Sequence, residues 1–394
     1  MNVRFQKMSI NYLYIDDDKT SDLEELIAEL EYHSDSNLSI THIQTRPMKE
    51  VQSIFLEGKF DGFIIDQRLD AANEREEVAG YWGTSLAQNL RTEMIGGHVP
   101  HAPIVLLSNE EVFVQYFNKD ESAHNLFDFT LGKTAVSKCE RFAHQASHIL
   151  LGLADAYHIA NNEVQPRVSR EKNIERLLEP LLRWDSKAFK YSDKRFIEHV
   201  NAKIHDPHTL ISLILNSLVR SSGMLVTEKV LATRLGIDIE QSSDWESLKI
   251  LLEEAKYQGV FASIKERWWF SRLEDWWYDN NIHKNVLRAL TASERVEAIK
   301  VFTGLHNLVE ISPKYKNGKQ SEKFWVNCIA SDTPLDPADA LLVSKPDLMP
   351  WEVPLYLDPQ TTHDREYDRA KYKVHSDHQK KVKALYWRLT RSGE

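Results

Sequence analysis

The first 160 residues alternate between short apolar runs and longer amphipathic segments. Apolar runs that end in a polar residue predict five buried strands, at 11–15, 38–45, 61–66, 103–108 and 127–131. Between them, apolar residues recur every three or four positions and predict helices at 20–34, 48–57, 83–94, 110–118 and 135–161. Five such units predict an α/β fold with a doubly wound, five-stranded parallel sheet.

The pattern changes after the last of these helices. Residues 162–172 are polar and include a proline, which predicts a linker after a first domain over 1–161. Residues 173–310 predict a mostly α-helical domain. Residues 311–394 predict a short strand at 324–330, an irregular proline-rich segment and a basic C-terminal helix over 364–391. The long final helix of the first domain, over 135–161, is interpreted as a packing helix or as a connector with a dimer seam.

Composition is typical of a water-soluble globular protein. The chain has 394 residues, of which 42% are hydrophobic and 27% charged. No run of 18 apolar residues occurs, so we expect no membrane span. The two cysteines, Cys139 and Cys328, exclude a disulfide scaffold, and we expect a cytoplasmic protein. Residues 1–133 carry 23 acidic and 11 basic side chains, whereas the remainder is close to neutral, which indicates differently composed domains.

Polar side chains of a particular kind follow four of the predicted strands. Asp16 and Asp17 end the first strand, Asp66 the third and Ser108 the fourth, and Lys133 comes just after the fifth. In an open parallel sheet the carboxyl ends of the strands meet at one edge, where functional residues gather. We therefore expect three carboxylates, a hydroxyl and an ammonium group to lie close together there.

Such a cluster has a clear chemical requirement. Three neighbouring carboxylates repel one another, and a divalent cation removes that repulsion. Mg²⁺ is the cation expected here, because it prefers oxygen ligands and keeps several waters. An ion held by Asp16 and Asp17 beside a third carboxylate, Asp66, suits nucleophilic attack on phosphorus. Lys133 and Ser108 would then neutralise and bind the phosphoryl oxygens.

The motifs YIDDD, GFIIDQRLD, IVLLSN and LGK, in this order, resemble the receiver domain of two-component response regulators, over about residues 9–161. This resemblance implies a flavodoxin-like fold and phosphoryl transfer from a histidine kinase to Asp66. It also implies that Mg²⁺ is held by Asp16, Asp17, Asp66 and the backbone carbonyl of Arg68. Ser108 and Lys133 would be the residues that respond to the phosphoryl group.

The segment that follows Asp66 departs from the usual pattern of the family. The stretch between Asp66 and Gly83 is longer than is usual in the family, and its acidic insertion would shield the site or bind a partner.

The sequence LGKT at 131–134 matches the end of a phosphate-binding P-loop. Phe127 stands where that loop needs glycine, so we exclude a P-loop.

The region after the predicted linker, residues 173–394, is called the output region and carries weaker indications of function. Residues 227–238 resemble the first half of a helix-turn-helix motif, but the next predicted helix, 244–256, is acidic and would be repelled by DNA phosphates. A core helix built on Leu248, Leu251 and Leu252 is the better interpretation. The basic tail could dock on the acidic first domain, contact nucleic acid or remain a solvated face. The two tryptophan pairs, 268–269 and 276–277, are expected to anchor a core.

These observations predict a response-regulator-type protein that is phosphorylated on Asp66 and acts through protein contacts with an effector or a second copy. We find no motif for a separate enzymatic domain. Its unusual output region is similar to regulators of phage-defence two-component systems, which implies a phosphate sink, although no motif after residue 161 carries that comparison. The alternative is a DNA-binding transcriptional regulator controlled by the receiver.

Overall fold

The computed structural model describes residues 9–34, 37–70, 78–115, 117–119, 121–315 and 319–391. The chain divides into two compact units, and each contains segments that are distant in sequence. The first unit comprises 1–183, 200–215 and 259–265, and the second comprises 184–199, 216–258 and 266–394.

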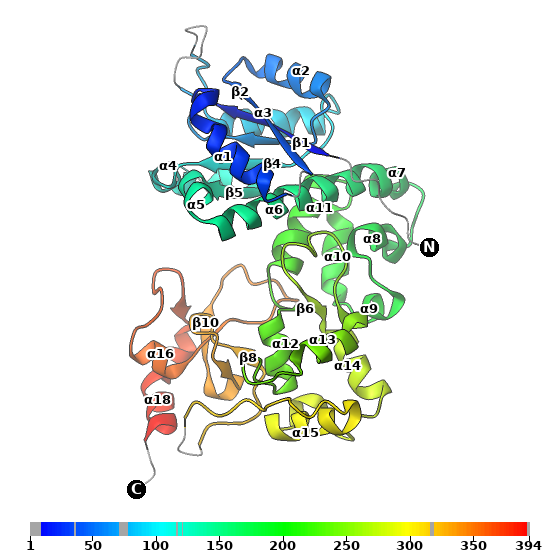
Figure 1. Ribbon diagram of the computed structural model, residues 1–394, viewed down its shortest axis with the longest axis vertical. Helices are drawn as coiled ribbons and strands as arrows, with labels where there is room; N and C mark the ends of the chain where they lie inside the picture. Colours follow the sequence, from blue (N-terminus) through cyan, green and yellow to red (C-terminus); the bar gives the residue numbers. More distant parts are fainter. Residues whose placement is uncertain are drawn as a thin grey trace. The chain divides into compact units, whose positions relative to one another are not determined.

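The first unit is built on a five-stranded parallel sheet with the order β2-β1-β3-β4-β5, shown in blue and cyan in Figure 1. The strands are β1 (Ile10–Asp16), β2 (Leu38–Gln44), β3 (Gly62–Ile65), β4 (Ile104–Ser108) and β5 (Phe129–Gly132). All four neighbouring pairs are parallel. The predicted flavodoxin-like α/β fold is therefore confirmed.

Helices flank the sheet in the predicted order. They are α1 (Thr20–Tyr32), α2 (Met48–Gly58), α3 (Gly83–Ile95), α4 (Glu110–Gln115), α5 (Lys133–Lys138) and α6 (Glu140–Ile159). The single helix predicted over 135–161 is wrong at its start, because Cys139 adopts an extended conformation and separates α5 from α6. The helix predicted over 110–118 is also shorter, since α4 is followed by a 3₁₀ turn at Phe117–Lys119.

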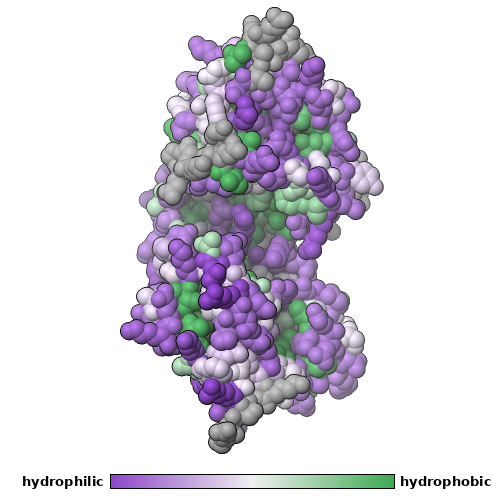
Figure 2. Space-filling view, turned by 90° about the vertical axis from the view of Figure 1, so that its left-hand side faces the viewer, coloured by the Kyte–Doolittle hydropathy of each residue, from purple (hydrophilic) through white to green (hydrophobic). Residues whose placement is uncertain are grey.

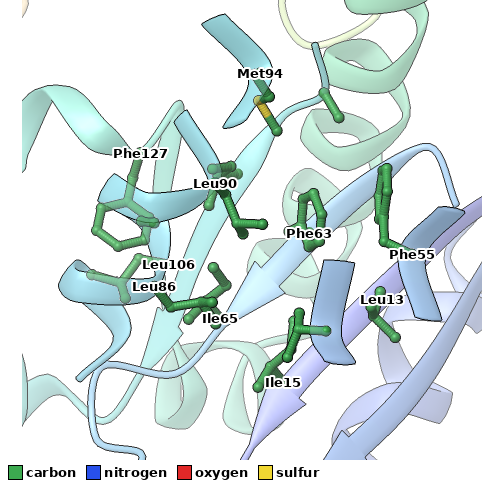
Figure 3. Packing of buried hydrophobic residues seen from close by; sticks show 14 of the residues in the cluster. Leu13, Ile15, Phe55, Phe63, Ile65, Leu86, Leu90, Met94, Leu106 and Phe127 are labelled. Carbon is green, nitrogen blue, oxygen red and sulfur yellow. The ribbon is translucent and has the colours of Figure 1, made fainter. Parts of the chain in front are cut away.

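The core of this unit follows the alternation of the strands. Leu13, Ile15, Phe63 and Ile65 point to one face of the sheet and pack against α2 and α3, as Figure 3 shows. The intervening residues of β1 point to the opposite face, where the Tyr12 hydroxyl donates a hydrogen bond of 2.7 Å to the carbonyl of Leu150 in α6. Helix α6 thus takes the place of the predicted fifth helix against the sheet.

A buried polar network lies at the amino ends of β4 and β5. The Asp128 carboxylate accepts hydrogen bonds from the Arg91 guanidinium (2.8 Å), the Tyr157 hydroxyl (2.8 Å) and the backbone N–H of Ile104 (2.8 Å). The His208 ring lies 3.1 Å from the same carboxylate. His208 belongs to α11 (Pro207–Leu213), so this network joins a helix from much later in the chain to the sheet.

The helical path continues past the predicted domain boundary. A π-helical turn (Ala160–Val164) and α7 (Gln165–Val168) extend α6. Most of the segment predicted as a linker, 162–172, is therefore helical, and Pro166 stands just after the π-helical turn. Helix α8 (Ile174–Leu182) then completes the continuous part of the first unit.

Residues 173–310 are mostly helical, as predicted, and many of these helices belong to the second unit. Its helices are α9 (Ser186–Lys190), α12 (Glu228–Leu235), α13 (Trp245–Leu251), α14 (Phe270–Asp279), α15 (Ala292–Thr303), α16 (Pro359–His363), α17 (Ser376–Gln379) and α18 (Val382–Thr390), and α10 (Lys194–Lys203) begins in it. Short strands form small antiparallel sheets: β6 (Leu225–Val226) with β7 (Trp268–Trp269), β8 (Val326–Asn327) with β9 (Pro334–Leu335), and β10 (Leu341–Ser344) between β11 (Tyr356–Leu357) and β12 (Lys373–Val374).

The tryptophans anchor this unit. Trp268, Trp269 and Trp277 are buried, which confirms the predicted core role of the tryptophan pairs. In α13, Leu248 is buried as predicted. Leu252 is also buried as predicted, whereas Leu251 is half exposed, so its predicted core position is wrong. The predicted strand at 324–330 is limited to β8.

The basic tail does not form one helix over 364–391. It contains β12 and the two short helices α17 and α18, and only α18 matches the predicted C-terminal helix. On the face of the molecule drawn in Figure 2, hydrophilic residues predominate and hydrophobic residues form small separate groups. None of the helices in the described part of the chain is long and apolar enough to cross a membrane.

Candidate phosphoacceptor site

The carboxyl ends of β1, β3, β4 and β5 bring four of the predicted residues together. Asp16 is buried at the end of β1, Asp66 directly after β3 and Ser108 at the end of β4. Lys133 begins α5 directly after β5. These four strands are neighbours in the sheet, so their ends lie side by side. The prediction that these groups meet at one sheet edge thus matches the geometry of the structure.

Lys133 holds the acidic residues together. Its Nζ lies 2.7 Å from Asp16 Oδ2, 3.3 Å from Asp66 Oδ1 and 3.2 Å from Asp18 Oδ2. Burial would lower the pKa of Lys133, but the carboxylates of Asp16 and Asp66 outweigh this effect and raise it well above its usual value. The ammonium group is therefore permanently charged and faces more negative charge than it can neutralise.

Asp66 is held from the backbone side. Its Oδ2 accepts a hydrogen bond of 2.6 Å from the N–H of Arg68. A Cβ atom on Gly83, at the start of α3, would lie 2.1 Å from the Asp66 carbonyl oxygen, so this close approach requires glycine. Burial raises the pKa of the Asp66 carboxyl to about 7; Lys133 opposes this shift and Asp16 reinforces it.

Two buried oxygen atoms at this edge have hydrogen-bonding capacity left over. Asp66 Oδ1 has an ion-pair contact with Lys133 at 3.3 Å but no hydrogen bond with a residue that the structure describes, and Ser108 Oγ likewise forms none of normal geometry. Ser108 is nonetheless close enough to Asp66 to lower the pKa of that carboxyl. Buried polar atoms are normally paired, so each exception calls for an explanation, such as a ligand or ion that binds there.

The acidic residues at the end of β1 fit a hard cation. Oxygen atoms of Asp16, Asp17 and Asp18 lie within 4.8 Å of one another, close enough to bind one ion. Together with Oδ1 of Asp66, this donor set consists only of carboxylate oxygens, which suits Mg²⁺. The predicted ligands included Asp16, Asp17 and Asp66 but not Asp18, and the role of the Arg68 carbonyl stays a prediction.

Sequence reasoning missed the residue that positions Lys133. The carboxylate of Glu110, at the start of α4, accepts a hydrogen bond of 3.0 Å from the N–H of Ala135. Burial of Glu110 would raise its pKa, but this bond and those from Thr134 lower it. Glu110 therefore ties the segment after Ser108 to the first turn of α5. Only its place two residues after Ser108 could have indicated this role.

The insertion after Asp66 is described in part. Residues 71–77, which carry most of its acidic side chains, lie outside the described residues. Tyr81, at its end, donates a hydrogen bond to the carbonyl of Arg46, so this end of the insertion is fixed to the start of α2.

Comparison with solved structures finds matches of low similarity. No family model and no curated protein matches this chain. Among solved structures, a sensor protein from Polaromonas sp. JS666 is 14% identical, covers 36% of this chain and 98% of its own, and has a TM-score of 0.24. A putative pilus assembly-related protein from Burkholderia pseudomallei is 19% identical, with coverages of 37% and 96% and a TM-score of 0.23.

The third is a lysine decarboxylase from Francisella novicida, which is 13% identical, with coverages of 60% and 32% and a TM-score of 0.24. All three TM-scores are below 0.5, so our interpretation of the site depends on its geometry.

Proposed function

We propose that the first unit accepts a phosphoryl group on Asp66 from a partner histidine kinase in a signalling pathway. The observation that carries this proposal is the position of Asp66: its buried carboxylate stands at the end of β3, 3.3 Å from Lys133, with Asp16 and the unpartnered Ser108 hydroxyl at the same sheet edge.

The residues divide the work of a phosphoryl transfer. A carboxylate oxygen of Asp66 forms a bond to phosphorus while the bond from phosphorus to the histidine nitrogen of the kinase breaks. The electron pair of that bond stays on the imidazole. Lys133 would neutralise one phosphoryl oxygen and Ser108 would donate a hydrogen bond to another. Mg²⁺, held by Asp16 and Asp17 with Asp66, would supply positive charge for the remaining oxygens.

The second unit contributes the output, which we propose is made through protein contacts. The helix that follows α12 in the helix-turn-helix-like segment is α13, and its Lys249 is already paired with Glu228 and Glu246, each at 2.8 Å. The remaining charge of this segment is negative. DNA phosphates would be repelled there, so an output through DNA binding has less support.

The test is the intact mass of the full chain after incubation with acetyl phosphate and Mg²⁺. We expect one phosphoryl adduct on the wild type and none on Asp66→Asn. Asp70→Asn is the matched control, because Asp70 is an exposed acid four residues away, and we expect it to be modified like the wild type. An adduct on Asp66→Asn, or none on the wild type, would contradict the proposal. The decay rate of the adduct distinguishes a switch from a phosphate sink.

A further inference from the structure

The second unit contains a cleft of about 650 Å³ with aromatic walls, lined in part by residues of α12 and α14. Trp269 and Phe270 form one side, and Trp325 and Trp351 contribute from later in the chain. This volume lies in the range of small-molecule sites, which are mostly apolar with a few placed polar groups. The aromatic walls offer flat surfaces on which a planar ligand can stack.

One polar group in this cleft is unusual. Arg234, at the end of α12, is only 3% exposed, and its Cζ lies 4.1 Å from the centroid of the Phe270 ring and 5.1 Å from that of Trp325. Its Nε is buried, and within the described residues the guanidinium donates no hydrogen bond and forms no ion pair. A buried guanidinium without an acceptor is costly, and an acceptor bound in the cleft would remove that cost.

Two neighbouring arginines show how such a group is normally satisfied. Arg288 and Arg295 also lie over Trp325. Arg288 pairs with Asp336 at 2.9 Å, and Arg295 donates to backbone carbonyls, among them that of Phe324 at 2.8 Å. Burial lowers the pKa of Arg234 to about 10, so it stays charged at neutral pH. Arg234 therefore offers donors that the fold itself does not use.

The acidic residues of the cleft differ in whether they form ion pairs. Asp193, Asp275 and Glu352 are paired with Arg195 (2.7 Å), Arg272 (3.2 Å) and Lys345 (2.6 Å), respectively. Glu274, on α14, forms no hydrogen bond or ion pair with a described residue, although it is close enough to Arg234 to interact electrostatically. The cleft thus presents unused donors beside one unused acceptor, and Arg234 is the one basic side chain among its described lining residues.

We propose that this cleft binds an uncharged guanine-type base, as the free base or the nucleoside. Arg234 would donate to the ring acceptors O6 and N7, and Glu274 would accept from the donors N1–H and N2–H. The rings would stack on the aromatic walls. Guanine fits because its acceptor and donor edges adjoin, so one ligand can pair with both Arg234 and Glu274.

The test is a titration of the full chain with guanosine, followed by calorimetry and tryptophan fluorescence, since Trp269, Trp325 and Trp351 line the cleft. We expect saturable binding. Inosine lacks the N2 donor and 7-deazaguanosine lacks the N7 acceptor, so each should bind about tenfold more weakly, the loss of one good hydrogen-bonding pair. GTP should bind more weakly than guanosine, because Arg234 is the one basic side chain in the described lining and the base already occupies its donors.

Two variants test whether Arg234 and Glu274 bind the base. Arg234→Lys keeps the charge but loses the fork of donors, and Glu274→Gln loses the charged acceptor; we expect both to weaken guanosine binding at least tenfold while thermal unfolding stays cooperative. Asp279→Asn is the matched control on α14, because Asp279 is exposed and pairs with Lys187 outside the cleft. The proposal would be overturned if the wild type did not bind guanosine, or if both variants bound guanosine as tightly as the wild type does. Tighter binding of GTP or of free tryptophan than of guanosine would also overturn it.

Discussion

The two ends of the sheet in the first unit carry buried charges of opposite character. At the amino end, the Asp128 carboxylate is matched by Arg91 and by hydrogen bonds from Tyr157 and Ile104. At the carboxyl end, Lys133 faces three carboxylates, and Ser108 Oγ has no hydrogen-bonding partner among the described residues. The balanced network is satisfied within the fold, whereas the unbalanced one leaves the surplus negative charge on which our proposal of cation and phosphoryl binding depends.

The largest expected effect concerns the balanced network. Asp128→Asn should lower the free energy of unfolding by about 3–5 kcal/mol, because it leaves the buried Arg91 charge without its partner. Urea unfolding followed by circular dichroism measures this. A loss below about 1 kcal/mol, the size expected for an exposed pair such as Arg68–Asp70, would show that the network does not hold the fold.

The pair of Arg91 and Asp128 also predicts that the free energy of unfolding depends on pH. Burial would raise the pKa of Asp128, but Arg91 and His208 more than offset this and hold it well below its usual value. Ionised Asp128 therefore stabilises the fold above the unfolded pKa of about 3.9, and this stabilisation is lost as pH falls towards the lower folded pKa. The difference in unfolding free energy between the wild type and Asp128→Asn should narrow between about pH 4 and pH 2. A constant difference would contradict this assignment.

Magnesium should act on the other end of the sheet only. At ten times its dissociation constant, Mg²⁺ should raise the free energy of unfolding of the wild type by about 1.4 kcal/mol. Asp128→Asn should gain the same increment, and Asp66→Asn clearly less, because it removes a proposed ligand. Thermal unfolding with and without Mg²⁺ measures this. An equal gain in Asp66→Asn would place the ion elsewhere.

The smallest effect is the change in stability on removing the phosphoacceptor itself. Without Mg²⁺, Asp66→Asn should raise the free energy of unfolding by about 1 kcal/mol, because it removes surplus negative charge while Asp16 and Asp18 continue to neutralise Lys133. Urea unfolding of both proteins at pH 7.5 tests the sign. A loss of more than about 1 kcal/mol would mean that Asp66 is a structural residue like Asp128.

The sheet and the cluster of charged residues at its carboxyl edge were predictable because both depend on local patterns. Buried parallel strands appear as apolar runs, and parallel topology then brings Asp16, Asp66, Ser108 and Lys133 to one edge. The Asp128 network was not predictable in this way. Arg91 and Asp128 are 37 residues apart, and His208 comes from a helix 80 residues beyond Asp128. No local pattern marks such partners.

The division of the chain was harder to predict for a similar reason. Residues 200–215 and 259–265 belong to the first unit although they come after the polar segment that was interpreted as a linker. The continuation of α6 into a π-helical turn and α7 removes the expected break. In the second unit, the unused donors of Arg234 could not be inferred, because whether a buried arginine finds a partner depends on packing around Phe270 and Trp325.

The central claim is that Asp66 itself becomes phosphorylated, and its most direct test locates the modified residue. The full chain is treated with acetyl phosphate and Mg²⁺ and then with borohydride, which reduces an aspartyl phosphate to homoserine, and the peptides are sequenced by mass spectrometry. Our account predicts homoserine at position 66, and at none of Asp16, Asp17 or Asp18. Homoserine at another position, or unmodified Asp66 in the treated protein, would contradict it.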